Sequence, residues 1–262
     1  FPRKVDDTSL ALFSTVLDYD NSKNYRFIVG QANGNLFMHD KQGKALEGWR
    51  PNKVTGSTSL SLQHFKIKGK DYLLSVDETG KVCIISRKGD LRSKPVDLNS
   101  IAHVGPLYKA KSKNDVLQLV TSDGRLIQLD VSGKIVDTQV LPKSSTNSKF
   151  RLVTDAGATA AWVSRVDKKT IAILDLSGNL VFEKENPGSE KISLTCFDFG
   201  QNVQVFCFWD VQQEFAYLYD QNGMMISGKP FECSLPPSVI HGASGEIIIF
   251  SNYRNQISKH SF

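Results

Sequence analysis

The chain has 262 residues, of which 40% are hydrophobic and 23% are charged, with 19 Gly and 9 Pro. This composition excludes a disordered tail, a collagen-like fibre and a small disulfide-stabilised protein. The formal net charge is +5, and the basic residues are scattered along the chain, so we expect no nucleic-acid partner. No run of about 18 apolar residues is present, and therefore no transmembrane segment is expected.

The first elements of the chain include a polar segment that could be mistaken for a metal site. Asp18–Asn24 places oxygen-bearing side chains at alternate positions, as calcium-binding loops do. It lacks the central glycine and the closing glutamate of the helix-loop-helix calcium motif. We therefore predict a polar hairpin tip here, and no metal site.

One pattern recurs along the chain: a turn, a short apolar strand and a second turn that ends in glycine. The closing glycines of five copies are Gly43, Gly89, Gly133, Gly178 and Gly223. Their successive spacings of 46, 44, 45 and 45 residues indicate an internal repeat. An aspartate precedes four of these glycines by three residues, at Asp40, Asp130, Asp175 and Asp220, and Ser86 takes this place in the second copy. Such side chains accept hydrogen bonds from turn amides, so we assign them to turns rather than to catalysis.

Each repeat also contains two earlier strands joined by a polar tip, and a short strand after the closing glycine. In the second repeat, the strands Ser61–Ile67 and Tyr72–Val76 flank the tip Lys68–Lys70. Four antiparallel strands per repeat of this length are typical of a β-propeller blade. We predict an all-β fold, a β-propeller of six four-stranded blades in a single domain covering residues 1–262. The blades are expected at residues 6–51, 57–98, 101–143, 148–188, 190–232 and 236–262, the last completed by residues 1–5.

The sixth repeat predicts how the ring closes. Residues 238–262 supply three strands, and the chain then ends. In the five complete repeats a proline follows the closing glycine by six to nine residues, and Pro2 offers the same residue near the N-terminus. We therefore expect residues 1–5 to form the missing outer strand. A five-bladed ring with a loose tail, or part of a larger ring, remains open.

The segment Asp40–Trp49, an aspartate turn followed by Gly-Lys and a later tryptophan, resembles the repeats of quinoprotein-like propellers. The repeat is also broadly similar to WD40-like propellers. The resemblance implies a propeller fold and, for non-catalytic members, a scaffold role. No residue of this sequence matches a cofactor-binding residue of these propellers, and we therefore expect no cofactor.

Four cysteines, Cys83, Cys196, Cys207 and Cys233, form no Cys-x-x-Cys pair, which argues against a structural zinc site. If Gln201 and Asn202 form a two-residue turn, Cys196 and Cys207 face each other across a hairpin. We favour buried thiols, with a disulfide between Cys196 and Cys207 as the alternative. The redox compartment stays undecided, although an extracytoplasmic location (secreted, periplasmic or surface-attached) is the slightly favoured expectation.

Other residue clusters have a structural and a functional interpretation. The fifth repeat is rich in aromatic residues between Phe197 and Tyr219, for which we expect packing between sheets rather than an exposed recognition patch. The trios Lys66, Lys68, Lys70 and Lys109, Lys111, Lys113 predict solvated strand faces or hairpin tips. His103 and His241 begin opposite blades of a six-bladed ring, but no carboxylate partner accompanies them.

These observations favour a non-enzymatic propeller scaffold that binds another protein or a polysaccharide through loops on one face. The sequence begins at Phe1 without a signal peptide, so we expect either a processed form or a piece excised from a longer protein, which is part of a larger chain or complex. The expected binding residues, on tips joining second and third strands, are Lys168, Lys169, Tyr253 and Arg254. The alternative is a hydrolase or lyase with a metal-assisted site at the central channel, formed by His103 and His241.

Overall fold

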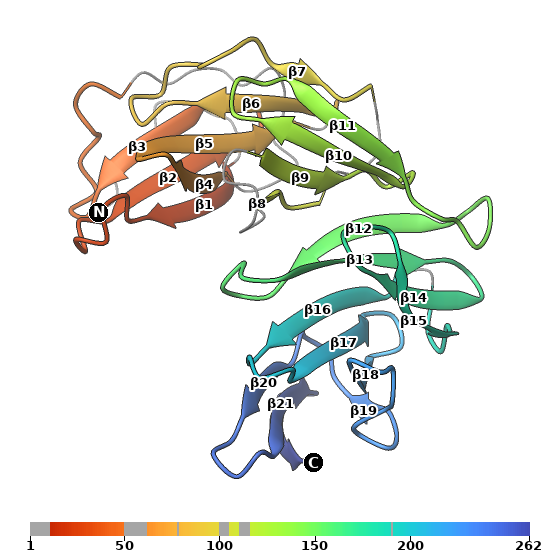
Figure 1. The fold of residues 1–262 in the computed structure, drawn as a ribbon. Helices are drawn as coiled ribbons and strands as arrows, with labels where there is room; N and C mark the ends of the chain where they lie inside the picture. The colour runs from red at the N-terminus through yellow and green to blue at the C-terminus, as the bar shows by residue number, and fades with distance from the viewer. Residues whose placement is uncertain (1–10, 50–61, 78, 100–104, 110–115, 190) are drawn as a thin grey trace. The chain divides into compact units, whose positions relative to one another are not determined.

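The computed structural model describes residues 11–49, 62–77, 79–99, 105–109, 116–189 and 191–262 (Figure 1). All regular elements in this part of the chain are β-strands, arranged in six sheets of three or four strands. Every sheet falls within one of the predicted blade intervals. By its contacts the chain divides into two compact units, Phe1–Ser122 with Leu126–Gln139 and Asp123–Arg125 with Val140–Phe262. Each unit holds three sheets and is described by itself.

The first unit contains the sheets of the first three repeats. The first sheet is formed by β1 (Ala11–Leu17), β2 (Arg26–Gln31) and β3 (Leu36–Asp40). The second is formed by β4 (Gln63–Ile67), β5 (Lys70–Val76), β6 (Lys81–Ile85) and β7 (Val96–Asp97). The third is formed by β8 (Tyr108–Lys109), β9 (Val116–Val120), β10 (Arg125–Asp130) and β11 (Ile135–Val140).

The core of this unit is explained by alternation along β5 and β6. Successive side chains of a strand point to opposite faces of the sheet. Leu73 and Ile85 pack against the first sheet, in a cluster with Ile28. Their neighbours Leu74 and Ile84 pack against the third sheet. Because both faces of the second sheet are covered, β5 and β6 are nearly uninterrupted apolar runs in the sequence.

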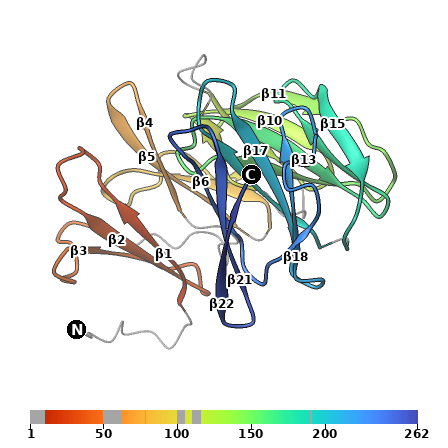
Figure 2. The ribbon, with the colours of Figure 1, turned by 90° about the horizontal axis from the view of Figure 1, so that it is seen from below.

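The second unit contains the sheets of the last three repeats. The first of them is formed by β12 (Lys149–Thr154), β13 (Ala161–Val166), β14 (Thr170–Leu174) and β15 (Leu180–Glu185). The next is formed by β16 (Ser193–Asp198), β17 (Gln204–Asp210), β18 (Phe215–Asp220) and β19 (Phe231–Glu232). The last is formed by β20 (Ser238–His241), β21 (Ile247–Tyr253) and β22 (Gln256–Ser261), and Figure 2 shows β21 and β22 running as a hairpin.

The aromatic residues of the fifth repeat fill the space between these sheets, as predicted. Phe206 is completely buried, and its ring meets those of Trp162 and Phe182 edge-on at centroid distances of 5.2 and 5.5 Å. Trp209 lies on the other face of β17, packed with the last sheet, and its indole nitrogen donates to the carbonyl of Cys233 at 3.0 Å. Phe215 is the exception, with 37% of its surface exposed.

The aspartates before the closing glycines are turn residues, which confirms their assignment. In the first copy, Asp40 Oδ1 accepts hydrogen bonds from the amides of Gln42 and Lys44 at 3.0 and 2.9 Å. Gly43 has a φ of 79°, a conformation that glycine adopts without steric cost. Ser86 Oγ replaces the carboxylate in the second copy, with two longer bonds of 3.2 Å. Asp18 likewise accepts the amides of Ser22 and Lys23 within the tip between β1 and β2.

The cysteine pairing expected from the sequence is wrong by one residue. Gln201 and Asn202 do form the turn, but Gly200, with a φ of 75°, adds one residue to its side of the hairpin. Cys196 therefore lies opposite Phe206, and Cys207 lies opposite Thr195. A shift of one residue turns the two thiols to opposite faces of the sheet. All four cysteines are buried thiols that form no disulfide, which confirms the preference for thiols.

The predicted ring closure lies outside the described residues, since residues 1–5 belong to the part that is not described. Within the described part, the β1–β3 and β20–β22 sheets have three strands each. The number of blades in a closed ring, the single-domain assignment and the outer strand at the N-terminus stay predictions. No helix in the described part of the chain is long and apolar enough to cross a membrane.

Candidate functional site

The predicted contact residues lie on tips at one end of the second unit. In each sheet of this unit, the tip between the second and third strands lies at the same end as the segment that enters from the previous sheet, because neighbouring strands are antiparallel. Hydrogen bonds join these tips and segments into one continuous surface. Its parts are residues 142–148, 167–169, 186–189, 210–214, 233–235 and 252–255.

Asp167 fixes the first tip of this surface. Its Oδ1 accepts the amides of Lys169 and Thr170, both at 2.9 Å, and its Oδ2 accepts the hydroxyl of Ser144. Burial alone would raise the pKa of Asp167, but these hydrogen bonds outweigh it and hold the pKa below its ordinary value. The carboxylate is thus ionised at neutral pH and ties the tip to the segment that precedes β12.

Asp210 has the same function in the next sheet. It is completely buried, and it accepts the amides of Gln212 and Gln213 within its own tip at 2.8 and 3.1 Å. It also accepts the amide of Ser189, which lies in the segment between β15 and β16. Asn186, in that same segment, donates its side-chain amide to the carbonyl of Asp167 at 2.8 Å. Two successive tips are therefore joined through one connecting segment.

The third tip is joined in the same way. Glu214 accepts the hydroxyl of Ser234 at 2.8 Å, and the amide of Ser234 donates to the carbonyl of Asn252 at 2.7 Å. Asn252 leads into the turn Arg254–Asn255, where both residues have a positive φ. The guanidinium of Arg254 lies over the ring of Tyr253 at 4.9 Å. The last tip thus presents an aromatic and cationic pair, in which Arg254 is exposed and Tyr253 is half-buried.

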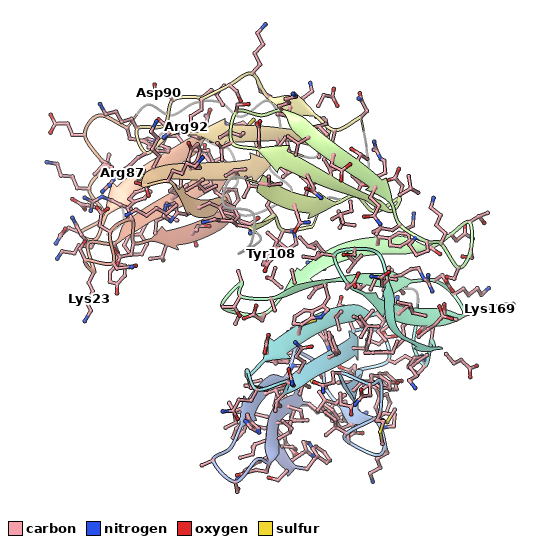
Figure 3. All side chains as sticks on the ribbon, viewed as in Figure 1. Lys23, Arg87, Asp90, Arg92, Tyr108 and Lys169 are labelled. Atoms are coloured by element: carbon pink, nitrogen blue, oxygen red, sulfur yellow. The ribbon has the colours of Figure 1, made fainter. Side chains whose placement is uncertain are left out.

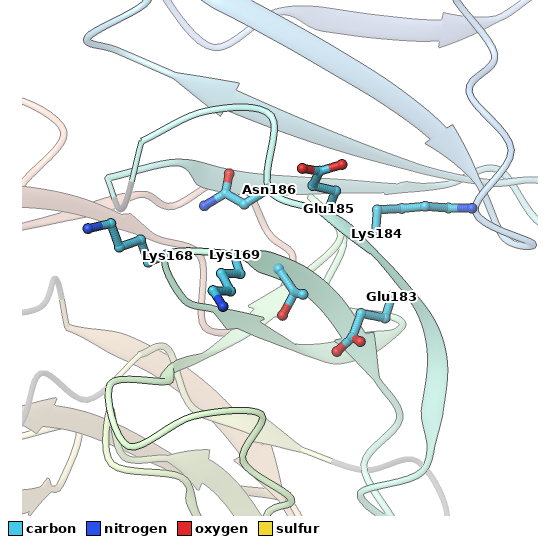
Figure 4. Close-up of a pocket in the computed structure, with 7 residues that line it drawn as sticks. Lys168, Lys169, Glu183, Lys184, Glu185 and Asn186 are labelled. Atoms are coloured by element: carbon cyan, nitrogen blue, oxygen red, sulfur yellow. The ribbon is translucent and has the colours of Figure 1, made fainter.

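The second unit has a hollow of about 520 Å³ beside the first tip, and two predicted residues line it (Figure 4). Lys168 and Lys169 of the tip line one side of the hollow. The other side is lined by residues of β15 and of the segment after it, namely Glu183, Lys184, Glu185 and Asn186. Thr170 pairs with Glu185 across the sheet, which places the acidic side chains beside the two lysines. Glu183 also forms an ion pair with the buried Arg165. The hollow thus presents cations and carboxylates together.

The four predicted residues therefore share one end of the unit but form two separate sites. Lys168 and Lys169 are exposed in the hollow, while Tyr253 and Arg254 lie two sheets further along, with the tip 211–214 between them in the hydrogen-bonded series. Glu183 and Asn186, which complete the hollow, were not predicted from the sequence. The carboxylates that fix the tips were not predicted either, although Asp167 and Asp210 occupy equivalent places directly after β13 and at the end of β17.

The histidines of the alternative enzyme site do not form a site that can be described. His103 lies outside the described residues. His241 is the exposed last residue of β20, and its ring lies 5.6 Å from that of Phe199. In the part of the chain that is described, no group of three or more His, Cys, Asp or Glu side chains is arranged to hold a metal ion.

Comparison with solved structures settles the fold. A catalytically inactive variant of virginiamycin B lyase from Staphylococcus aureus matches 95% of this chain and 88% of its own, with 13% identity and a TM-score of 0.58. The Pan2 WD40 domain of Neurospora crassa matches 93% of this chain and 76% of its own, with 14% identity and a TM-score of 0.55. The Cps50 (Swd1) β-propeller domain of Myceliophteria thermophila matches 90% and 82%, with 14% identity and a TM-score of 0.55.

The chain is a β-propeller. The propeller fold confirms the interpretation of the 45-residue repeat as a blade and the resemblance to quinoprotein-like and WD40-like propellers. No protein-family profile matches the chain, and no curated protein matches it. At identities of 13 to 14% these likenesses establish the fold of the propeller and do not extend to its activity.

Proposed function

We propose that this propeller is a non-enzymatic scaffold that binds another protein through the tips of its second unit. The observation that carries the proposal is the hollow beside Lys168 and Lys169. Its mixed lysines and glutamates complement a peptide segment, which offers carbonyls, amides and side chains of both charges. A polysaccharide is less well served, because Arg254 covers one face of Tyr253, the aromatic ring among the predicted contacts.

The way in which the tips are held supports a binding role. Binding costs free energy when loops must be ordered, and surfaces that are already fixed avoid much of this cost. Asp167 and Asp210 fix two successive tips through buried carboxylates, while the side chains of Lys168 and Lys169 remain exposed. A rigid backbone that presents exposed side chains is the arrangement expected of a recognition surface.

The last tip gives a second line of support. Arg254 has a φ of 46° at the first position of a two-residue turn, where asparagine or glycine is preferred. An arginine at such a position costs on the order of 1 kcal/mol of stability relative to those residues. An arginine at this position is explained if Arg254 and the half-buried Tyr253 contact a partner, since arginine and tyrosine are among the residue types that contribute most to protein interfaces.

The proposal is tested by quantitative affinity capture from the cells that produce the protein. The wild-type chain is compared with K168A/K169A, with Y253A/R254A, and with the control K229A/K259A, which removes two charges from exposed lysines of the unit that lie outside this surface. A protein partner lost by the first two variants and retained by the control supports the proposal. Equal retention by all variants, confirmed by titration of the purified partner, would overturn it.

A further inference from the structure

A second surface, in the first unit, carries an unusual concentration of positive charge. The first unit has 20 Lys and Arg against 14 Asp and Glu, a formal charge of +6, whereas the second unit has 12 against 13. Most of the excess lies at one end of the β4–β7 sheet. Residues 66–71 and 87–94 contain seven basic residues and two acidic ones, a formal charge of +5, as large as that of the whole chain.

These two segments meet at the same end of the sheet. The tip between β4 and β5 and the connection between β6 and β7 are adjacent because the strands between them are antiparallel. Arg92 donates to the carbonyl of Asp71 at 2.8 Å, and Arg87 lies 3.5 Å from the carboxylate of Asp71. Figure 3 labels Arg87, Asp90 and Arg92, which lie together at this end of the unit. We call residues 66–71 and 87–94 the basic end.

The basic end extends to the neighbouring sheet. Lys109 of β8 donates its ammonium group to the carbonyl of Lys66 at 3.1 Å. The corresponding end of the β12–β15 sheet provides a contrast. Its tip and turn, residues 155–160 and 175–179, contain two carboxylates and neither Lys nor Arg. The repeat by itself therefore does not impose the charge found at this end of the β4–β7 sheet.

The basic end already holds one carboxylate of the chain itself. Arg87 donates to both oxygens of Asp20, at 2.8 and 3.3 Å, in the two-pronged geometry that guanidinium and carboxylate groups favour. Lys66 lies 3.7 Å from the same carboxylate. Arg87 is kept in place by the ring of Tyr19, 4.5 Å below it. Tyr19 is 95% buried and its hydroxyl has no hydrogen-bond partner among the described residues, so the ring serves as a fixed apolar support.

The neighbourhood of the basic end favours a peptide over a nucleic acid. Asp20, Asp71 and Asp90 are interleaved with the cations, and they would repel a phosphate backbone that carries charge at every step. The rings of Tyr19 and Tyr72 have a guanidinium, that of Arg87 or Arg92, over one face, which leaves fewer aromatic surfaces for base stacking. An acidic peptide can place glutamates against the cations and neutral residues against the aspartates.

We propose that the basic end binds an acidic peptide segment of a partner protein. The exposed lysines Lys70, Lys88 and Lys94 supply the long-range attraction, and the carboxylates of the peptide are bound in the manner that Arg87 binds Asp20. This surface lies in the first unit, and its proposal does not depend on the tips of the second unit.

The experiment measures the fluorescence anisotropy of a labelled oligoglutamate peptide titrated with the complete chain, at about 50 mM and about 200 mM salt. Oligoglutamine of the same length is the uncharged probe, and short single-stranded and duplex DNA are the nucleic-acid probes. The variant K70Q/K88Q/K94Q removes three exposed charges, and K143Q/K149Q/K191Q removes three exposed charges from the second unit as a matched control. Circular dichroism verifies that every variant is folded.

We expect the wild-type chain to bind oligoglutamate and not oligoglutamine, with weaker binding at the higher salt concentration. Loss of one exposed ion pair raises the Kd by a factor of roughly 1.5 to 5, so the loss of three in K70Q/K88Q/K94Q should raise the Kd about tenfold. The control should remain within about twofold. The proposal is overturned if oligoglutamate does not bind at low salt, if both variants lose affinity equally, or if DNA binds more tightly than the peptide.

Discussion

Replacement of Asp210 by alanine tests whether the tips of the second unit are held by buried carboxylates. The side chain accepts three backbone amides, of which those of Gln212 and Gln213 belong to an exposed tip and that of Ser189 belongs to the connecting segment. A hydrogen bond to a charged group contributes about 1.5 to 3 kcal/mol, and the two exposed amides regain part of this from water. We expect D210A to lower the free energy of unfolding by about 3 to 4 kcal/mol.

The assay is urea unfolding followed by circular dichroism, with D175A as the matched control. Asp175 accepts two backbone amides at 2.8 Å and the side-chain amide of Asn179 at 2.9 Å, all in an exposed turn of a single sheet. Because water replaces these bonds when the carboxylate is removed, its loss should cost only about 1 kcal/mol. With a denaturant slope of about 3 kcal/mol/M, D210A should lower the urea midpoint by about 1 M. If D210A costs no more than D175A, the carboxylate does not hold the surface together and the reasoning is wrong.

The same residue gives a pH dependence of known sign. Burial would raise the pKa of Asp210, but the amides of Ser189, Gln213 and Gln212 outweigh it and hold the folded-state pKa below its ordinary value. A depressed pKa stabilises the fold above the unfolded pKa near 4, and this contribution is lost as the pH falls through the folded value. The stability difference between the wild-type chain and D210N should therefore shrink on acidification from neutral pH. A constant difference would contradict this explanation.

Three further predictions follow from the packing. G223A should destabilise the fold by about 2 to 4 kcal/mol, because Gly223 has a φ of 75° and a Cβ there would lie 2.8 Å from the ring of Phe182. Gly228 has open space around it, so G228A should cost about 1 kcal/mol in the same urea assay. Equal costs for the two variants would contradict the contact with Phe182. F206A should cost about 3 to 5 kcal/mol and the partly exposed F215A less than half as much, and the reverse order would refute the core assignment. The four thiols should react with a thiol reagent only after unfolding, and fast labelling of the native chain would show that one of them is accessible.

The sequence was sufficient for the fold because its signals are local and repeated. The turn at Asp40 and Gly43 needs nothing outside its own five residues, and the spacing of such turns indicates the blade. The apolar runs of β5 and β6 are also a local signal, and they indicate that both faces of this sheet are buried. Local reasoning fails where one extra residue changes the register of a hairpin. The sequence allows Gly200 either in the strand or in the turn, and its positive φ places it in the turn, so that Cys196 is not paired with Cys207.

Only part of the candidate site could be predicted from the sequence. Lys168 and Lys169 could be chosen because they stand on a tip between two recognisable strands. Glu183 and Asn186 could not, since the pairing of β14 with β15 and a bond to Asp167 bring them to the same hollow. From the sequence, Lys66, Lys68 and Lys70 were interpreted as a solvated strand face or hairpin tip. Residues 87–94, which add to their charge, are sixteen residues further along the chain and reach the same end only through the pairing of the sheet.

The hydrogen bonds between tips and connecting segments have a consequence for how the second unit unfolds. Asp167 secures the segment before β12, Asp210 secures the segment before β16, and Glu214 secures the segment before β20. In each case a tip of one sheet is hydrogen-bonded to a segment that connects this sheet with a neighbouring one. When one sheet unfolds, the segment that leads to its neighbour therefore loses these hydrogen bonds. We expect the three sheets to exchange their amide hydrogens as one cooperative block, with few states in which a single blade opens alone.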